Sequence, residues 1–169
     1  RVKNYINGEW VESKTKEYGD VWCPASGEKI GEVPFSTAED IDKAAQAAKK
    51  AYWEWRCTPP LTRARYFFKL KDLFETAFED ISRTLVTEEG KTLDESRGEV
   101  RRMIENVEHA TGVTTMMTGY NLEDIAQGID CTAERQPIGV FGSIAPFNFP
   151  AMVPWWFLPY AVVCGNTYI

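Results

Sequence analysis

The alternation of hydrophobic and polar positions in the first part of the chain predicts short strands followed by an amphipathic helix. Residues 5–11 carry an Asn-Gly dipeptide between residues that favour strands, which is typical of a β-hairpin. A second pair of short strands is predicted around a turn at residues 24–27. Ser36 and Glu39 have capping-box spacing and predict the start of a helix, which Pro59-Pro60 ends. The buried face of this helix would be formed by Ile41, Ala44, Ala45, Ala48, Tyr52 and Trp55.

Three further helices are predicted between residues 61 and 117. The first carries a wide apolar stripe that we interpret as core: Ala64, Phe67, Phe68, Leu73, Phe74, Ala77 and Phe78. Asp80 is predicted to cap a short helix that turns Ile81 and Leu85 inward and ends at Gly90. A longer helix, from about residue 93 to residue 117, would place these positions against the core: Val100, Ile104, Val107, Ala110 or Thr111, and Thr114.

The last part of the chain predicts an excursion followed by a strand–helix–strand unit. Residues 120–136 are polar and lose helical periodicity, which indicates either a loop or an arm of short strands. Residues 139–145 form an apolar run with small residues, typical of a buried strand, until Pro146 stops it. Residues 150–163 are predicted to be mostly helical, and residues 166–169 to begin another strand. Such a unit implies a parallel strand pair with a crossover, so the fold class is α/β.

Composition and charge exclude several functional classes. With 169 residues, 44% hydrophobic and 26% charged, the chain is typical of a soluble domain with a real core. A net charge of −6, with no run of Lys and Arg, argues against nucleic-acid binding. No basic segment followed by an apolar stretch opens the chain, and prolines interrupt its most apolar segment. We therefore expect a cytoplasmic protein that binds neither nucleic acid nor membrane.

The cysteines and the last residues of the chain carry two further expectations. Cys23, Cys57, Cys131 and Cys164 lie far apart without a C-x-x-C pair, which indicates free thiols and no metal site. Residues 166–169 look like the first residues of a buried strand. Because a natural domain rarely stops there, we expect the chain to be a fragment of a longer protein.

Asn148 is the main candidate for chemistry. It lies just past the carboxyl end of the predicted strand, between Pro146 and Pro150, where open α/β sheets bind their ligands. A neutral amide donor held rigidly at such a point can stabilise a developing oxyanion. Asparagine between prolines is also an ordinary turn residue, and local chemistry leaves both interpretations open.

Other candidate motifs are weaker. Gly90-Lys91-Thr92 resembles the end of a P-loop, but Leu85 stands where that motif needs glycine. The dinucleotide fingerprint G-x-G-x-x-G is missing, so a nicotinamide cofactor would be held differently. His109, the only histidine, has no evident catalytic partner and is interpreted as structural. Cys164 is interpreted as a buried small residue, because no cationic neighbour would favour its thiolate.

Arg102 has two interpretations. It lies on the side of its predicted helix away from the apolar stripe, so periodicity favours a solvated residue that pairs with Glu99 or Glu105. An arginine that lines a substrate channel would avoid the core in the same way. Its planar fork suits bidentate recognition of a carboxylate.

Residues 144–150, Ile-Ala-Pro-Phe-Asn-Phe-Pro, resemble the nucleotide-binding and oxyanion segment of the aldehyde dehydrogenase superfamily. Residues 5–10, 24–27, 88–93 and 165–167 add matches in family order, so the resemblance covers essentially the whole chain. Residues 98–100, 107–110 and 116–117 make the chain most similar to the methylmalonate-semialdehyde dehydrogenases, which acylate coenzyme A (CoA).

The resemblance implies roles for individual residues. Asn148 would bind the oxyanion of a thiohemiacetal, and Arg102 would contact the substrate carboxylate. The residues that would line the NAD site are Ile144, Ala145, Pro146 and Phe147. The cysteine nucleophile and the general base of the family would lie beyond Ile169, so none of the four cysteines fills that role.

The resemblance also implies a domain organisation and a reaction. Residues 1–119 and 137–169 would belong to a Rossmann-like NAD-binding domain, which is incomplete here. Residues 120–136 would be part of an oligomerisation arm, which implies a homodimer or homotetramer. The whole enzyme would oxidise malonate or methylmalonate semialdehyde with NAD and CoA, with loss of CO2. The alternatives are an aldehyde dehydrogenase that hydrolyses its acyl-enzyme with water, and a non-catalytic fragment that acts only in association.

Overall fold

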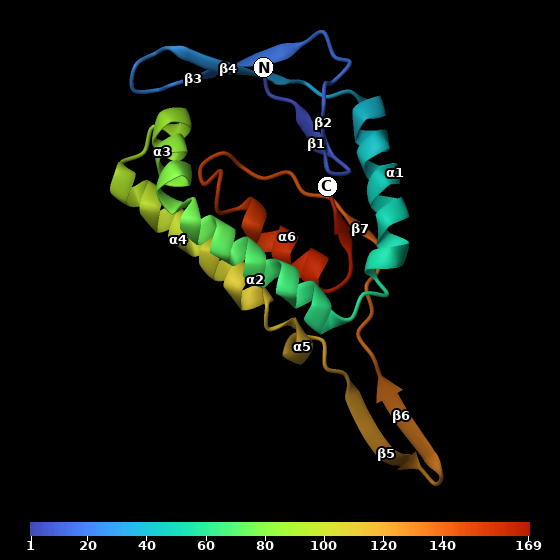
Figure 1. Ribbon diagram of the computed structural model, residues 1–169. Helices are drawn as coiled ribbons and strands as arrows, with labels where there is room; N and C mark the ends of the chain where they lie inside the picture. The colour runs from blue at the N-terminus through green and yellow to red at the C-terminus, as the bar shows by residue number, and fades with distance from the viewer.

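The computed structural model describes all residues from 1 to 169 and confirms the α/β class (Figure 1). Two antiparallel hairpins open the chain, β1 (Asn4–Ile6) with β2 (Glu9–Val11) and β3 (Tyr18–Trp22) with β4 (Lys29–Pro34). Both hairpins are as predicted. In the first turn Asn7 and Gly8 have φ of 53° and 81°, and an Asn-Gly pair tolerates this left-handed conformation.

Helix α1 (Ala38–Trp55) begins with a capping box one residue later than predicted. Thr37 is the N-cap, and its backbone N–H donates to the carboxylate of Asp40 at 2.9 Å. Ser36 instead exchanges hydrogen bonds with the side chain of Asn4. The predicted buried face is only partly covered, because Tyr52 is buried whereas Ile41 is 56% exposed.

The core lies among the helices α2 (Pro60–Thr76), α3 (Phe78–Glu89), α4 (Leu93–Ala110) and α6 (Pro154–Val163). Figure 1 shows α2, α4 and α6 side by side, with α3 beside one end of α4. The most buried apolar side chains form two clusters. The first contains Ala64, Phe67, Val107, Ala110, Val113 and Val163, and the second contains Leu85, Val100, Met103 and Ile104.

Three details of the helix predictions are wrong. The stripe of α2 is narrower than predicted, since Phe68 and Leu73 are more than half exposed. Asp80 is not a cap, because α3 already begins at Phe78 and ends, as predicted, at Gly90 with φ of 87°. The long helix is interrupted at Gly112 before the short α5 (Val113–Met116). This interruption shifts the helical phase, so that Val113 is buried and Thr114 is exposed.

Residues 120–133 form an antiparallel hairpin that points away from the helices (Figure 1). Its strands are β5 (Tyr120–Ala126) and β6 (Ile129–Ala133), and every residue of both is exposed. Of the two predicted conformations, the structure therefore has an arm of short strands.

The final unit pairs β7 (Val140–Phe141) with β8 (Thr167–Tyr168) in parallel, and α6 makes the predicted crossover. The pair contacts both α1 and α6. The predicted buried strand over residues 139–145 is wrong. Val140 and Phe141 are each 37% exposed, and residues 142–149 are exposed, because β8 is the only strand in this chain beside β7. None of the helices has the length and apolar character needed to span a bilayer.

Candidate functional site

Asn148 lies in an exposed turn between β7 and α6, and a side chain of helix α4 binds the backbone just after this turn. Oε1 of Glu99 accepts the backbone N–H groups of Ala151 and Met152 at 2.8 and 3.0 Å. The Glu99 side chain is only 1% exposed, although it carries a carboxylate. The turn that follows Asn148 is thus attached to the core through a charge-assisted contact, which is stronger than a hydrogen bond between neutral groups.

Lys91 completes this attachment. Its Nζ forms a close ion pair with Glu99 and lies 3.4 Å from the backbone oxygen of Asn148 and 4.5 Å from the ring centre of Phe149. Burial lowers the pKa of Lys91, but Glu99 and Glu89 outweigh that effect, so the pKa is raised and the ammonium form is favoured. Lys91 follows the left-handed Gly90 and precedes Thr92, which caps α4. The triplet is therefore a helix–helix junction, and the P-loop interpretation stays rejected.

Arg102 lies on the same side of α4 as this attachment. At about 100° per residue, Glu99, Arg102, Asn106 and His109 fall within an arc of about 80°. The first, third and fourth of these side chains contact the segment 151–160. Arg102 itself is exposed and forms no ion pair, and its predicted partner Glu99 is engaged with Lys91. The guanidinium of Arg102 therefore has no ion-pair partner within the chain.

The start of β7 is fixed by Asn166, a residue to which the sequence assigned no role. Its Oδ1 accepts the N–H groups of Ile138 and Gly139 at 2.7 and 3.1 Å, and its Nδ2 donates to the oxygen of Ala161 at 3.0 Å. Asn166 is 6% exposed, and all of these partners are backbone groups. The segment that contains Asn148 is therefore held before β7 by Asn166 and after the turn by Glu99.

A cavity of about 630 Å³ lies between the strand end and α6. Most of its lining is apolar, with Phe141 and Ile144 on one side and Trp156 and Phe157 on the other. The side chain of Ile144 is fully exposed, and Phe147 is 61% exposed. Apolar walls beside an exposed backbone suit a ring system with a polar tail. Of the residues 144–147 that are predicted to line the NAD site, the cavity includes Ile144.

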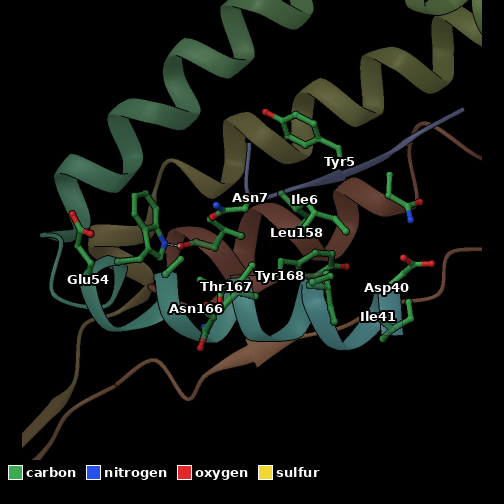
Figure 2. Close-up of a pocket in the computed structure, with 18 of the residues that line it drawn as sticks. Tyr5, Ile6, Asn7, Asp40, Ile41, Glu54, Leu158, Asn166, Thr167 and Tyr168 are labelled. Atoms are coloured by element: carbon green, nitrogen blue, oxygen red, sulfur yellow. Dashed lines mark hydrogen bonds between the residues drawn. The ribbon is translucent and has the colours of Figure 1, made fainter. Parts of the chain in front are cut away.

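A larger cavity of about 790 Å³ lies between α1, the first hairpin and α6 (Figure 2). It includes none of the predicted site residues, and three of its polar side chains already have partners within the chain. Asp40 accepts from Ser13 and Thr37, Asn166 binds backbone groups, and Thr167 donates to the oxygen of Ala48. By size alone this larger cavity would be the candidate site. We favour the smaller cavity, because it includes the predicted site residue Ile144 and the larger one includes none.

The remaining candidates do not join the site. His109 Nδ1 lies 2.9 Å from the hydroxyl of Tyr160, a contact that joins α4 to α6 and agrees with its structural interpretation. All four cysteines are free. The expectation that Cys164 has no cationic neighbour is wrong, since Arg63 and Arg135 act to lower its pKa; burial outweighs them, so the pKa is raised and the thiolate is disfavoured. Hydrogen bonds from Ser26 lower the pKa of Cys23, but Cys23 lines neither cavity. No group of three or more His, Cys, Asp and Glu side chains is arranged to hold a metal ion.

Comparison with known proteins identifies the family. The aldehyde dehydrogenase family matches residues 10–169, and the chain belongs to this family. A malonate-semialdehyde dehydrogenase from Bacillus pumilus is 46% identical over 168 residues, which cover 99% of this chain and 35% of that protein. The chain thus spans about a third of the length of this relative.

Solved structures agree with the fold. The crystal structure of a methylmalonate-semialdehyde dehydrogenase from Oceanimonas doudoroffii matches with a TM-score of 0.95 and 40% identity, over 99% of this chain and 34% of that one. A point mutant of betaine aldehyde dehydrogenase from Staphylococcus aureus, in complex with NAD+, matches with a TM-score of 0.91 and 27% identity. That match covers 98% of this chain and 34% of the other.

Proposed function

We propose that this chain is the N-terminal part of an NAD-dependent, CoA-acylating dehydrogenase of malonate or methylmalonate semialdehyde. The observation that supports the proposal is that one face of α4 carries both Glu99, which anchors the chain just after Asn148, and Arg102, which has no ion-pair partner. The turn of Asn148 is anchored on α4 through Glu99, and Arg102 lies one helical turn beyond Glu99. An aldehyde that also bears a carboxylate needs both an amide donor and a guanidinium. The names of the relatives from Bacillus pumilus and Oceanimonas doudoroffii support the same substrate class.

Each predicted site residue has its own function in this proposal. The amide of Asn148 donates to the oxygen that becomes negative when a cysteine outside these residues attacks the aldehyde, and so it lowers the barrier. Arg102 binds the carboxylate and orients the aldehyde carbon. Ile144, which lines the cavity beside α6, and its neighbours Ala145, Pro146 and Phe147 form the loop that holds NAD, and NAD supplies the hydride acceptor when bound. CoA then takes the acyl group, and CO2 is lost.

The substrate and cosubstrate are tested with the full-length protein that contains this chain. NADH formation is followed with methylmalonate semialdehyde and NAD, with and without CoA, and NADP replaces NAD in a parallel series. We expect rapid NADH formation only with CoA, together with release of CO2. Equal rates without CoA would contradict acylation and favour the rival enzyme that hydrolyses its acyl-enzyme with water.

Arg102 is tested by Arg102→Ala, with Arg101→Ala as a matched control. Arg101 is next in the chain but already pairs with Glu75 at 2.7 Å. We expect Arg102→Ala to lower kcat/KM for the semialdehyde at least about tenfold, because a hydrogen-bonded charge pair is lost. Propanal, which has no carboxylate, should be oxidised equally by both variants. An equal loss with propanal would exclude carboxylate binding by Arg102.

The exposed arm supports a second part of the proposal, a homodimer or homotetramer. Tyr120, Leu122, Ile125 and Ile129 are each more than half exposed on β5 and β6. Apolar side chains and open strand edges favour pairing with another copy. Sedimentation of the full-length protein, with and without residues 120–133, tests this. A dimer or tetramer that persists without the arm would contradict it. Association in a protein that lacks all NADH formation would favour the non-catalytic alternative.

A further inference from the structure

Glu99 is buried far more deeply than an acidic side chain normally is, and its contacts explain why. Asp40 is the only other buried acidic residue, and it belongs to a helix cap. Glu99 lies in the middle of α4, where a carboxylate is unfavourable for the core unless it is paired and hydrogen-bonded. Both conditions are met, because one oxygen pairs with Lys91 and the other accepts two backbone N–H groups.

The two bound amides follow the Asn148 turn directly. Pro150 has no N–H, so Ala151 and Met152 provide the first donors after Phe149. A carboxylate that accepts from two successive amides fixes the orientation of both peptide planes. The backbone bonds of this segment are local: the N–H of Val153 donates to the oxygen of Phe149 at 3.0 Å, and the N–H of Trp155 donates to the oxygen of Met152 at 3.0 Å. Glu99 is therefore the main restraint on the side of the turn that leads into α6.

Lys91 restrains the other side of the same turn. It contacts the backbone oxygen of Asn148 and the ring of Phe149, and it neutralises Glu99. Its position is set by the left-handed Gly90, where an added Cβ would come within 3.0 Å of Pro24. The pair therefore reaches the turn from a rigid junction between α3 and α4.

We propose that Glu99 and Lys91 are positioning residues that set the orientation of the Asn148 amide. The inference rests on the proposed oxyanion role of Asn148. A donor stabilises a transition state only if it is aimed before the charge develops. A displacement of about 1 Å can cost about 100-fold in rate. The buried ion pair thus acts on catalysis through Asn148 and makes no contact with the substrate.

The kinetic test is a double-mutant cycle in the full-length protein with Asn148→Ala and Glu99→Gln. We expect Asn148→Ala to lower kcat about 100-fold or more. Glu99→Gln should lower kcat about tenfold with KM within about twofold, since only transition-state stabilisation is affected. The double variant should match Asn148→Ala alone, because the two residues act as one unit. Additive losses, or an unchanged kcat in Glu99→Gln, would overturn the inference.

Matched variants separate positioning from stability. Glu79→Gln makes the same change in an ion pair with Arg97 on the exposed side of α3 and α4, and it should leave kcat unchanged. Lys91→Met should lower kcat about tenfold, as Glu99→Gln does. Lys91→Arg should keep most of the original kcat, because it keeps the positive charge. Lys91→Met also replaces Glu99→Gln if that variant does not fold. A kcat in Lys91→Arg as low as in Lys91→Met would leave no role for the charge.

Hydrogen exchange distinguishes a failed inference from a failed function. We expect Glu99→Gln to speed exchange at the amides of Ala151 and Met152 about tenfold, and Glu79→Gln to leave it unchanged. An unchanged kcat in Asn148→Ala would overturn the oxyanion role in the proposed function. Unchanged exchange in Glu99→Gln would overturn the positioning role even where Asn148→Ala is severely impaired.

Discussion

The two ends of α6 are both held by a buried charged side chain from another helix, but they are held in different ways. At the N-terminal end Glu99 accepts two backbone N–H groups, and at the C-terminal end Arg63 donates to the backbone oxygen of Val163. Each charge therefore lies where the helix dipole favours it, negative near the N-terminus and positive near the C-terminus. The difference lies in the counter-charge. Glu99 has Lys91, whereas Arg63 has no carboxylate partner.

Arg63 is satisfied by neutral groups alone. Its Nε donates to the oxygen of Val163 at 2.7 Å, a second nitrogen donates to the oxygen of Thr58, and a third lies 3.6 Å from the sulfur of Met117. Burial lowers its pKa, yet the guanidinium stays charged because arginine loses its proton only at very high pH. The C-terminal end is thus a structural joint. The N-terminal end, which has an exposed turn beside it, is the one that can serve a site.

The largest expected effect removes the C-terminal joint. We expect Arg63→Met to lower the free energy of unfolding by about 3 kcal/mol, because the oxygens of Val163 and Thr58 lose their donors in a buried place. Arg97→Met is the control, since its ion pair is exposed and should contribute less than about 1 kcal/mol. Denaturant unfolding of the full-length protein measures both variants. Equal losses would mean that the C-terminal end is not a distinct joint.

Tyr160→Phe tests the middle of the same helix, between its two charged ends. The hydroxyl of Tyr160 lies 2.9 Å from Nδ1 of His109 and donates to Asn106 at 3.3 Å. We expect a loss of about 1 kcal/mol, the usual contribution of a neutral hydrogen bond, with kcat unchanged. Tyr66→Phe serves as the control, because Tyr66 is 61% exposed. A fall in kcat for Tyr160→Phe would extend the catalytic restraint beyond the N-terminal end.

Local sequence signals predicted the elements around α6 but not what holds them. The Asn-Gly turn, the stop at Gly90 and the parallel crossover all depend on residues close together in the chain, and all three are present. Glu99 and Asn166 could not be found in this way, because their backbone partners lie up to 53 and 28 residues away. In the sequence, Glu99 looks like any solvated glutamate on the polar face of its helix. The role of Glu99 becomes visible only when the structure shows that this acidic side chain is buried.

Two of the wrong predictions failed for different physical reasons. An apolar run at residues 139–145 predicts burial, but burial requires neighbours, and this chain places one strand beside β7. The helical periodicity predicted one helix that continues past Gly112, because the apolar spacing does not reveal the change of helical phase between α4 and α5. Local chemistry left the roles of Asn148 and Arg102 open, the family resemblance favoured them and added residues 144–147, and all of these roles stay predictions until the variants are measured.

The smallest expected effect separates the two ends by pH. The raised pKa of Lys91 stabilises the folded state below the ordinary lysine pKa of about 10.4, and this contribution is lost as the pH rises through the higher folded value. The difference in free energy of unfolding between the unmodified protein and Lys91→Met should therefore be constant near neutral pH. It should shrink by less than about 1 kcal/mol in alkali. The corresponding difference for Arg63→Met should stay constant over the same range, because a guanidinium does not titrate there. If the difference in free energy of unfolding shrinks in alkali for both Lys91→Met and Arg63→Met, the counter-charge is not what distinguishes the two ends of α6.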